Sequence, residues 1–145
     1  MPAATLSRNS GPSDSTAHVH RIEVRPRRGQ TDPRGQAVLR QIQSLGLEKK
    51  PKRVDHAAVY LIEGALTSAD VARIADELLA DCVTQTSEIH ATPAAAAAKV
   101  TPGTSVVEVH PLPGVTDPAA ESVQLAIVAM LGKDVRVRTG DRYDL

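Results

Sequence analysis

Aromatic side chains are almost absent from this sequence of 145 residues, which contains two tyrosines, no phenylalanine and no tryptophan. Its core must therefore be built from aliphatic side chains, which bury less area per residue than aromatic ones. A unit of about 70 residues with such a core is close to the lower size limit for independent folding. We therefore expect each folding unit in this chain to need a second unit that covers part of its apolar surface.

Other scarcities disfavour whole classes of protein. The 17 basic and 17 acidic residues give a formal net charge of zero, which, with so few aromatic side chains, disfavours a ferredoxin-like RNA-binding module that stacks bases on its sheet. The single cysteine, Cys82, excludes an internal disulfide framework and suits a reducing compartment. No apolar run approaches the roughly 18 to 20 residues that span a bilayer, so we expect a cytoplasmic protein without a membrane segment. Residues 1–17 lack the apolar centre of a secretory signal, and their composition predicts a disordered leader.

One phrase of eleven residues occurs twice in the chain. Residues 23–33 read EVRPRRGQTDP and residues 108–118 read EVHPLPGVTDP, at an offset of 85. Seven of the eleven positions are identical, and Ile42 downstream of the first phrase returns in the same register as Ile127. Such a repeat indicates a duplicated folding unit. Because the second copy is cut off at Leu145, we expect one complete unit and one incomplete unit.

The first unit, residues 18–90, begins with a predicted strand and helix. Polar and apolar residues alternate over residues 18–26, which is typical of a strand. Asp32 can accept hydrogen bonds from the free N–H groups of a first helical turn, and Pro33 loses no hydrogen bond at the first helical position. The pattern therefore predicts a helix from Pro33 to about Leu45.

The remainder of the first unit predicts further strands around a second helix. Residues 54–63 are typical of two short strands or one bent ribbon, with apolar residues on both faces. Thr67 and Asp70 form a capping-box pattern before the next helix, and residues 82–90 predict a closing strand. The predicted order is β-α-β-β-α-β, and the expected fold class is α+β with a ferredoxin-like sheet that has two helices on one face and an open opposite face.

The second part of the chain predicts the same elements in the same order. Residues 91–104 have the composition of an alanine- and proline-rich linker. We expect residues 105–145 to form an incomplete second copy of the unit, in which Tyr143 falls near the position of Tyr60. Its expected elements are a strand over residues 105–112, a helix over residues 118–131 and the start of a pair of strands over residues 135–145.

No residues form a pattern that predicts catalysis or metal binding. Cys82 has no histidine neighbour in the sequence, so a packed structural role is favoured. His18 and His20 share one face of a predicted strand, but two ligands without a cluster of acids or cysteines do not make a metal site. Asp76 and Glu77 lie on the polar face of a predicted helix. We therefore expect no catalytic, cofactor-binding or metal-binding residue in this chain.

Basic residues gather in one loop and one connector. Arg25, Arg27 and Arg28 precede the predicted helix, Arg34 follows its start, and residues 49–53 carry further basic side chains. A helix N-terminus attracts phosphate, but Asp32 already caps this one and no glycine-rich loop precedes it. Three roles remain open for the basic residues: a solvated loop, a protein-docking surface, or a nucleotide or phosphate site.

Two segments of the chain resemble the PurS family. The first is the strand that leads into Pro-x-x-Gly-x-x-Asp-Pro and an amphipathic helix, and the second is the later segment YLIEG with its helix over residues 69–81. PurS is the small subunit of phosphoribosylformylglycinamidine synthase in purine biosynthesis, and the resemblance spans roughly residues 19–90. Residues 112–122, LPGVTDPAAES, resemble the start of the second half of the PurS-like region in the large, fused form of this enzyme. A chain of 145 residues matches neither the free-standing nor the fused length, so we expect a fragment of a longer product or a split version of the fused enzyme.

The resemblance implies an assembly role in an amide-transfer ligase, without catalytic groups in this chain. PurS-like parts hold the glutaminase subunit against the ATP-dependent synthetase subunit so that ammonia passes between them. ATP and magnesium would be used by the synthetase, and this chain would bind no cofactor. We expect self-association, as a homo-oligomer or a pseudo-dimer, through the open sheet face; the alternative function is a small-ligand-binding regulatory module of the same fold. The expected partner-docking residues are Arg25, Arg27, Arg28, Tyr60 and Ile62.

Overall fold

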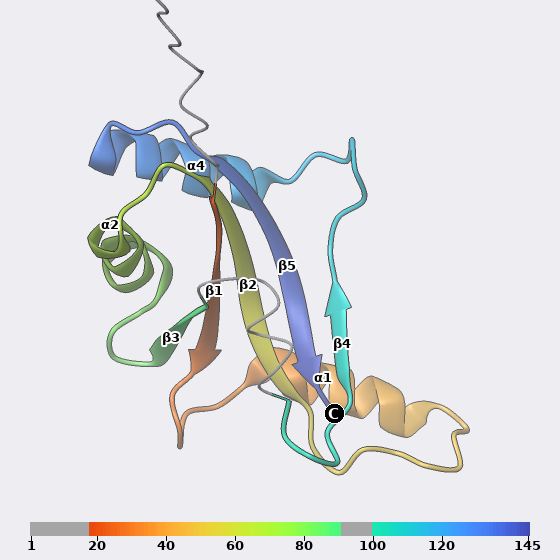
Figure 1. Ribbon diagram of the computed structural model, residues 1–145. Coiled ribbons are helices and arrows are strands. Elements are labelled where there is room, and N and C mark those ends of the chain that lie inside the picture. Colours follow the sequence, from red (N-terminus) through yellow and green to blue (C-terminus); the bar gives the residue numbers. More distant parts are fainter. Residues whose placement is uncertain (1–17, 91–99) are drawn as a thin grey trace, which may run out of the picture.

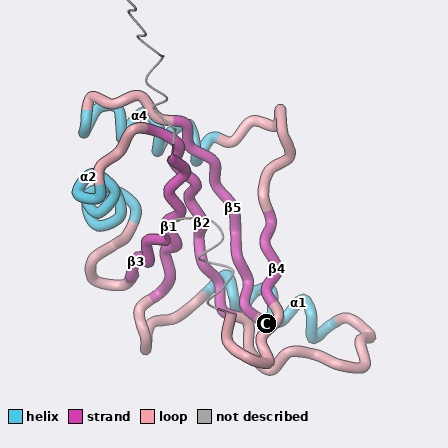
Figure 2. The backbone as a smooth tube through the Cα atoms, in the orientation of Figure 1, coloured by secondary structure: helices cyan, strands magenta, loops and turns pink. Residues whose placement is uncertain are grey.

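The computed structural model describes residues 18–90 and 100–145, which form one five-stranded antiparallel sheet (Figures 1 and 2). The strand order is β3-β1-β2-β5-β4, so strands from both parts of the chain lie in the same sheet. The leader and most of the linker expected from the sequence lie outside the described residues. The elements, in chain order, are β1 (His18–Pro26), α1 (Pro33–Ser44), β2 (Asp55–Gly64), α2 (Ser68–Arg73), the π-helix η1 (Ile74–Leu79), β3 (Gln85–His90), β4 (Val106–Val109), α4 (Pro118–Leu131) and β5 (Arg136–Asp144).

The predicted α+β class is confirmed, but the predicted strand count is wrong in both parts of the chain. Residues 55–64 form the single strand β2, which agrees with the alternative of one ribbon but not with the order β-α-β-β-α-β, and residues 136–144 form the single strand β5 instead of the start of a pair. The physical reason is that β2 is the central strand, paired with β1 on one side and with β5 on the other along almost its whole length. The first part of the chain is therefore β-α-β-α-β, and its sheet is completed by β4 and β5.

The two repeated phrases open the same local structure. Asp32 caps α1 by accepting a hydrogen bond from the N–H of Gly35 (2.8 Å), and Asp117 caps α4 in the same way through Ala120 (3.0 Å). The second carboxylate oxygen of Asp32 accepts the N–H of His56 in β2, and that of Asp117 accepts the N–H of a β5 residue. Each aspartate thus joins the start of a helix to the strand that follows it.

Strand register repeats as well. Val24 of β1 pairs with Ala58 of β2. Val109, which is 85 residues after Val24, pairs with Asp141, which is 83 residues after Ala58. β4 therefore pairs with β5 as β1 pairs with β2, except that the equivalent residues of β2 and β5 are 83 positions apart, whereas those of β1 and β4 are 85 positions apart.

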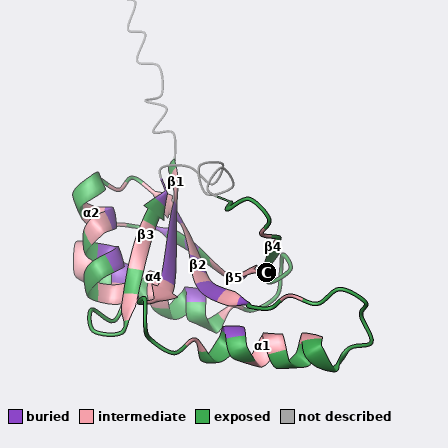
Figure 3. Cartoon of the chain, turned by 90° about the horizontal axis from the view of Figure 1, so that it is seen from below, coloured by how far each residue is buried: buried purple, intermediate pink, exposed green. Residues whose placement is uncertain are grey.

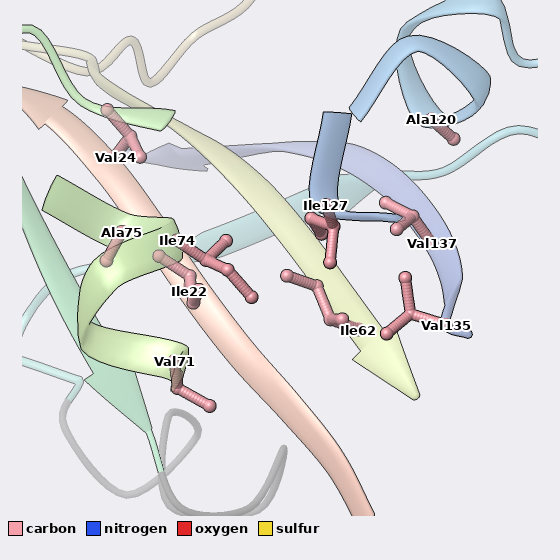
Figure 4. Close-up of a cluster of buried hydrophobic side chains, with 10 residues drawn as sticks. All are labelled: Ile22, Val24, Ile62, Val71, Ile74, Ala75, Ala120, Ile127, Val135 and Val137. Carbon is pink, nitrogen blue, oxygen red and sulfur yellow. The ribbon is translucent and has the colours of Figure 1, made fainter. Parts of the chain in front are cut away.

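A single apolar core joins the two parts of the chain on the helix-covered face of the sheet. Ile127 of α4 is fully buried, and its cluster contains Ile22 and Ile62 from the sheet and Ile74 from η1 (Figure 4). The two parts of the chain are also joined by an ion pair at 2.5 Å between Lys133, after α4, and Asp70 of α2. Helix α4 therefore packs on strands and a helix from the first part of the chain.

Helix α1 is covered much less than α4. In α1 only Gly35 is buried, and most of the helix is half-buried or exposed (Figure 3). The apolar residues of β4 show the same contrast, because Val107 and Val109 are 45% and 55% exposed while Ile22 and Val24 are 0% and 4% exposed. The apolar residues of β1 are less exposed because α2, η1 and β3 lie against that part of the sheet, and the described residues contain no equivalent elements beside β4.

Candidate functional site

The sheet face opposite the helices carries a cluster of charged side chains that we call the charged face. Arg21 of β1 donates to Glu108 of β4, with one contact at 3.2 Å and a second, shorter one. Glu23 is 1% exposed and accepts hydrogen bonds from three arginine side chains, within one strand or across strands. The six residues of the cluster are Arg21, Glu23, Arg25, Glu108, Arg142 and Asp144.

Small residues in the two central strands make this cluster possible. On the charged face, β2 presents Ala57 and Val59, and β5 presents Gly140. Side chains from β1 and β4, the strands on either side of β2 and β5, can therefore meet above these two strands. A Cβ atom at Gly140 would lie 2.3 Å from Nδ1 of His110, so this close approach requires glycine. The face opposite the helices was expected to be open, and that prediction is wrong at the centre of the sheet, because Ala57 and Val59 of β2 are both fully buried there.

The charged face connects the two parts of the chain. Arg21 pairs with Glu108, Arg25 pairs with Asp144 at 2.7 Å, and Arg142 pairs with Glu23 at 3.2 Å. Each of these ion pairs joins β1 to β4 or β5. Charged residues at every second position from Arg21 to Arg25 indicate a polar face of β1, but they do not indicate that residues of β4 and β5 meet this face.

Arginine contacts lower the pKa values of the acids in the cluster. Burial on its own would raise the pKa of Glu23, but hydrogen bonds from Arg25 and Arg21 and the charge of Arg142 bring it below its ordinary value. The hydrogen bonds from Arg21 are the largest cause that lowers the pKa of Glu108 from 4.5 to about 2. Both acids are therefore carboxylates throughout the neutral and mildly acidic range.

We expect the free energy of unfolding to fall as the pH drops from 4.5 toward 2. In this window the unfolded chain takes up a proton on Glu108 that the folded chain, with its pKa of about 2, does not, so acid favours the unfolded state. Urea unfolding at several pH values should show a shallower acid dependence for Glu108→Gln than for the unchanged chain. Glu48→Gln removes an exposed carboxylate and should keep the original slope; equal slopes for all three chains would contradict the prediction.

One group of side chains in this region has the geometry of a metal site. The ligand atoms of Glu23, Glu88 and His90 lie within 4.8 Å of one another, and Nε2 of the buried His90 has no hydrogen-bond partner among the described residues. However, Glu23 already accepts hydrogen bonds from three guanidinium groups. A divalent cation would be repelled by all three, so we assign Glu23 to the ion-pair cluster.

Two pockets of nearly equal size lie beside the two repeated loops. The first loop pocket, about 490 Å³, is formed by residues 25–32, the start of α1 and residues 52–56. The second loop pocket, about 500 Å³, is formed by residues 110–117, the start of α4 and residues 136–139. The two linings are equivalent in the repeat, because each pocket is formed by one copy of the repeated loop, the helix that follows it and the region where the next strand begins.

The loops of these pockets share a turn and differ in chemistry. In the first, the N–H of Gln30 donates to the carbonyl of Arg27 at 2.9 Å, and in the second the N–H of Val115 donates to the carbonyl of Leu112 at 3.1 Å. The third residue of each turn is a glycine with positive φ, 88° at Gly29 and 82° at Gly114, as a type II turn requires. The first pocket is rich in arginine and lysine, whereas the second presents apolar side chains at the same loop positions.

A third pocket, about 590 Å³, lies between the starts of α1 and α4 on the helix-covered face. His56 Nε2 and Arg34 Nη1 both contact Oδ1 of Asp141, at 2.7 and 2.8 Å. Burial is the main cause that raises the pKa of Tyr60 in the same pocket. Across the sheet, Tyr60 pairs with Thr139 and Tyr143 pairs with His56.

The structure brings together three of the five residues expected to dock a partner. Arg25, Arg27 and Arg28 all line the first loop pocket, although Arg25 also pairs with acids of the charged face, whereas Tyr60 lies in the pocket between α1 and α4. Ile62 is 0% exposed, so its side chain packs in the core and does not reach the surface of this chain. The pattern of β2, which is apolar on both faces, could not distinguish a core residue from a docking residue.

The side chains expected to have no chemical role lie in different elements, Cys82 in a turn and His18 and His20 in β1. Cys82 is exposed in the turn before β3, so the packed position expected for it is wrong. Among the described residues, no hydrogen bond joins a serine, threonine or cysteine side chain to a histidine, so none of them forms a nucleophile and base pair. His20 is half-buried, and burial together with the charge of His18 lowers its pKa.

A family model described as PurS, phosphoribosylformylglycinamidine (FGAM) synthase, matches residues 19–93, slightly more than half of the chain. The chain belongs to the PurS family. The matched range coincides with β1, α1, β2, α2, η1 and β3, and it places the protein in FGAM synthase, a ligase of purine biosynthesis. No curated protein and no solved structure matched the chain. Within residues 18–90 and 100–145, every helix is too short or too polar to cross a bilayer.

Proposed function

We propose that this PurS-family chain is a non-catalytic assembly module of FGAM synthase. It holds the glutaminase against the ATP-dependent synthetase, so that ammonia released from glutamine reaches the synthetase without escaping into solution. ATP and magnesium act in the synthetase, and this chain supplies surfaces only. The observation that carries the proposal is the family match over residues 19–93, a region whose described residues include no nucleophile and base pair.

The architecture supports an assembly role for the whole chain. We propose that residues 105–145 are an incomplete second copy of the unit and that the five-stranded sheet is a pseudo-dimer within one chain. In support, the helix caps and the strand register recur in both parts, and β2 and β5 pair over nine residue pairs at the centre of the sheet. A rigid sheet with two similar ends can contact two different partners at once.

The proposal predicts a specific kinetic effect. Adding this chain to the purified glutaminase and synthetase of the same enzyme should raise the glutamine-dependent rate of FGAM formation about tenfold or more, because positioning two active sites prevents loss of the intermediate. The rate with ammonium salt in place of glutamine should stay unchanged, since the synthetase then needs no delivery. Equal glutamine-dependent rates with and without the chain would rule the proposal out, and a change in the ammonium-dependent rate would point to a role in the chemistry itself.

A further inference from the structure

The first loop pocket carries positive charge that the rest of the described structure does not neutralise. Arg25 and Arg53, which line it, are paired with acids. Arg27 donates only to a backbone carbonyl, that of Gln85, and neither Arg28 nor Lys52 has an ion pair within residues 18–90 and 100–145. Three cationic side chains, on the loop and on the connector before β2, therefore face the same pocket without an ion pair in the described parts of the chain.

The acids of this pocket are already engaged. Asp32 uses one carboxylate oxygen to cap α1 and the other to accept the N–H of His56. Asp55 accepts a hydrogen bond from Arg53 at 2.7 Å. Arg27, Arg28 and Lys52 therefore face a single carboxylate that has no ion pair among the described residues, that of Asp32, which leaves an excess of positive charge.

The second loop pocket shows that folding does not require this charge. Leu112 and Pro113 occupy the positions of Arg27 and Arg28, and yet the turn, the glycine with positive φ and the aspartate cap are the same. In that pocket Arg136 and Arg138 face two carboxylates, those of Asp117 and Glu121, whereas the first pocket is lined by five cationic side chains and only two carboxylates, those of Asp32 and Asp55. The arginines of the first loop are therefore not explained by the stability of the loop.

We infer that the first loop pocket docks an acidic segment of a protein partner. The inference rests on the proposed function only in taking a protein as the partner. Carboxylates fit better than phosphate, because the carboxylate of Asp32 already accepts the N–H of Gly35 at the start of α1, where a phosphate would otherwise bind and would now be repelled. The three cations are spread over the loop and the connector, an arrangement that suits several side-chain carboxylates along an extended peptide.

The test uses the full chain and a fluorescein-labelled polyglutamate peptide, followed by fluorescence anisotropy at low salt. The double variant Arg27→Leu with Arg28→Pro copies the second loop, so it should fold like the unchanged chain in circular dichroism. We expect it to bind the peptide about tenfold more weakly, and Lys52→Gln about threefold more weakly. Raising the ionic strength to about 0.2 M should weaken binding of the unchanged chain as well.

The matched control removes the same amount of charge elsewhere. Arg136→Gln with Arg138→Gln alters two exposed arginines beside the second pocket and should leave peptide affinity within about twofold. Equal losses in the two double variants, or no loss in the first, would overturn the inference. Tighter binding of pyrophosphate or of a single-stranded oligonucleotide, lost in the same loop variant, would overturn it in favour of a phosphate site. The peptide assay needs no partner subunit, so its failure is distinguishable from a failure of the reconstitution experiment.

Discussion

Replacing Glu23 with glutamine is expected to lower the free energy of unfolding by about 3 kcal/mol. The side chain keeps its shape but loses the charge that satisfies Arg21 and Arg142, which are 4% and 5% exposed. Removing one partner of a buried ion pair is costly because the remaining charge is left in a poorly solvated place. Urea unfolding followed by far-ultraviolet circular dichroism measures the change, and the method suits a chain without tryptophan.

A surface pair provides the control for this substitution. Glu77 pairs with Arg73 at 3.2 Å on an exposed helical turn, so Glu77→Gln makes the same chemical change in solvent and should leave stability nearly unchanged. Because Glu23 contacts Arg142 of β5 as well as the arginines of β1, its loss should destabilise both parts of the chain in a single transition. Similar stabilities for the two variants would mean that the charged face contributes little to holding the parts together.

Local chemistry in the sequence predicted most of the elements. The range of β1 was predicted to the residue, because strict alternation fixes a strand and its faces. The start of α1 followed from the Asp-Pro pair, and the capping box of Thr67 and Asp70 is present as expected. These features depend on neighbours in the chain, so a single sequence is enough to find them.

Long-range pairing is what the sequence could not reveal. A segment such as residues 54–63, apolar on both faces, is compatible with one central strand or with two short ones, and only its pairing with β5 decides between them. The charged face is a similar case. Arg21 and Glu108 are far apart in the sequence, and nothing in their local patterns indicates that small residues on β2 and β5 let them meet.

Replacing Ile127 with alanine is the second substitution with a large expected effect, about 3 kcal/mol of lost stability. Ile127 is fully buried, and Figure 4 shows it directed at Ile62 of the central strand. The change removes three carbons from the point where α4 packs on the first part of the chain, and a well-packed core refills such a space only in part. Urea unfolding gives the loss, and Leu125→Ala, two residues away in the same helix at a position 72% exposed, should change stability by less than about 0.5 kcal/mol.

The repeat supplies a sharper comparison at Ile42, the residue of α1 that corresponds to Ile127. Ile42 is only half-buried, so Ile42→Ala should cost about 1 kcal/mol, well below the loss at Ile127. The difference between the two losses of stability thus measures how much the packing of α2 and η1 on α4 contributes, because α1 has no such neighbours. Equal losses at the two positions would mean that α1 is covered in solution, by a second copy or by another segment, and the exposed face of α1 and β4 would then have to be assigned to that contact.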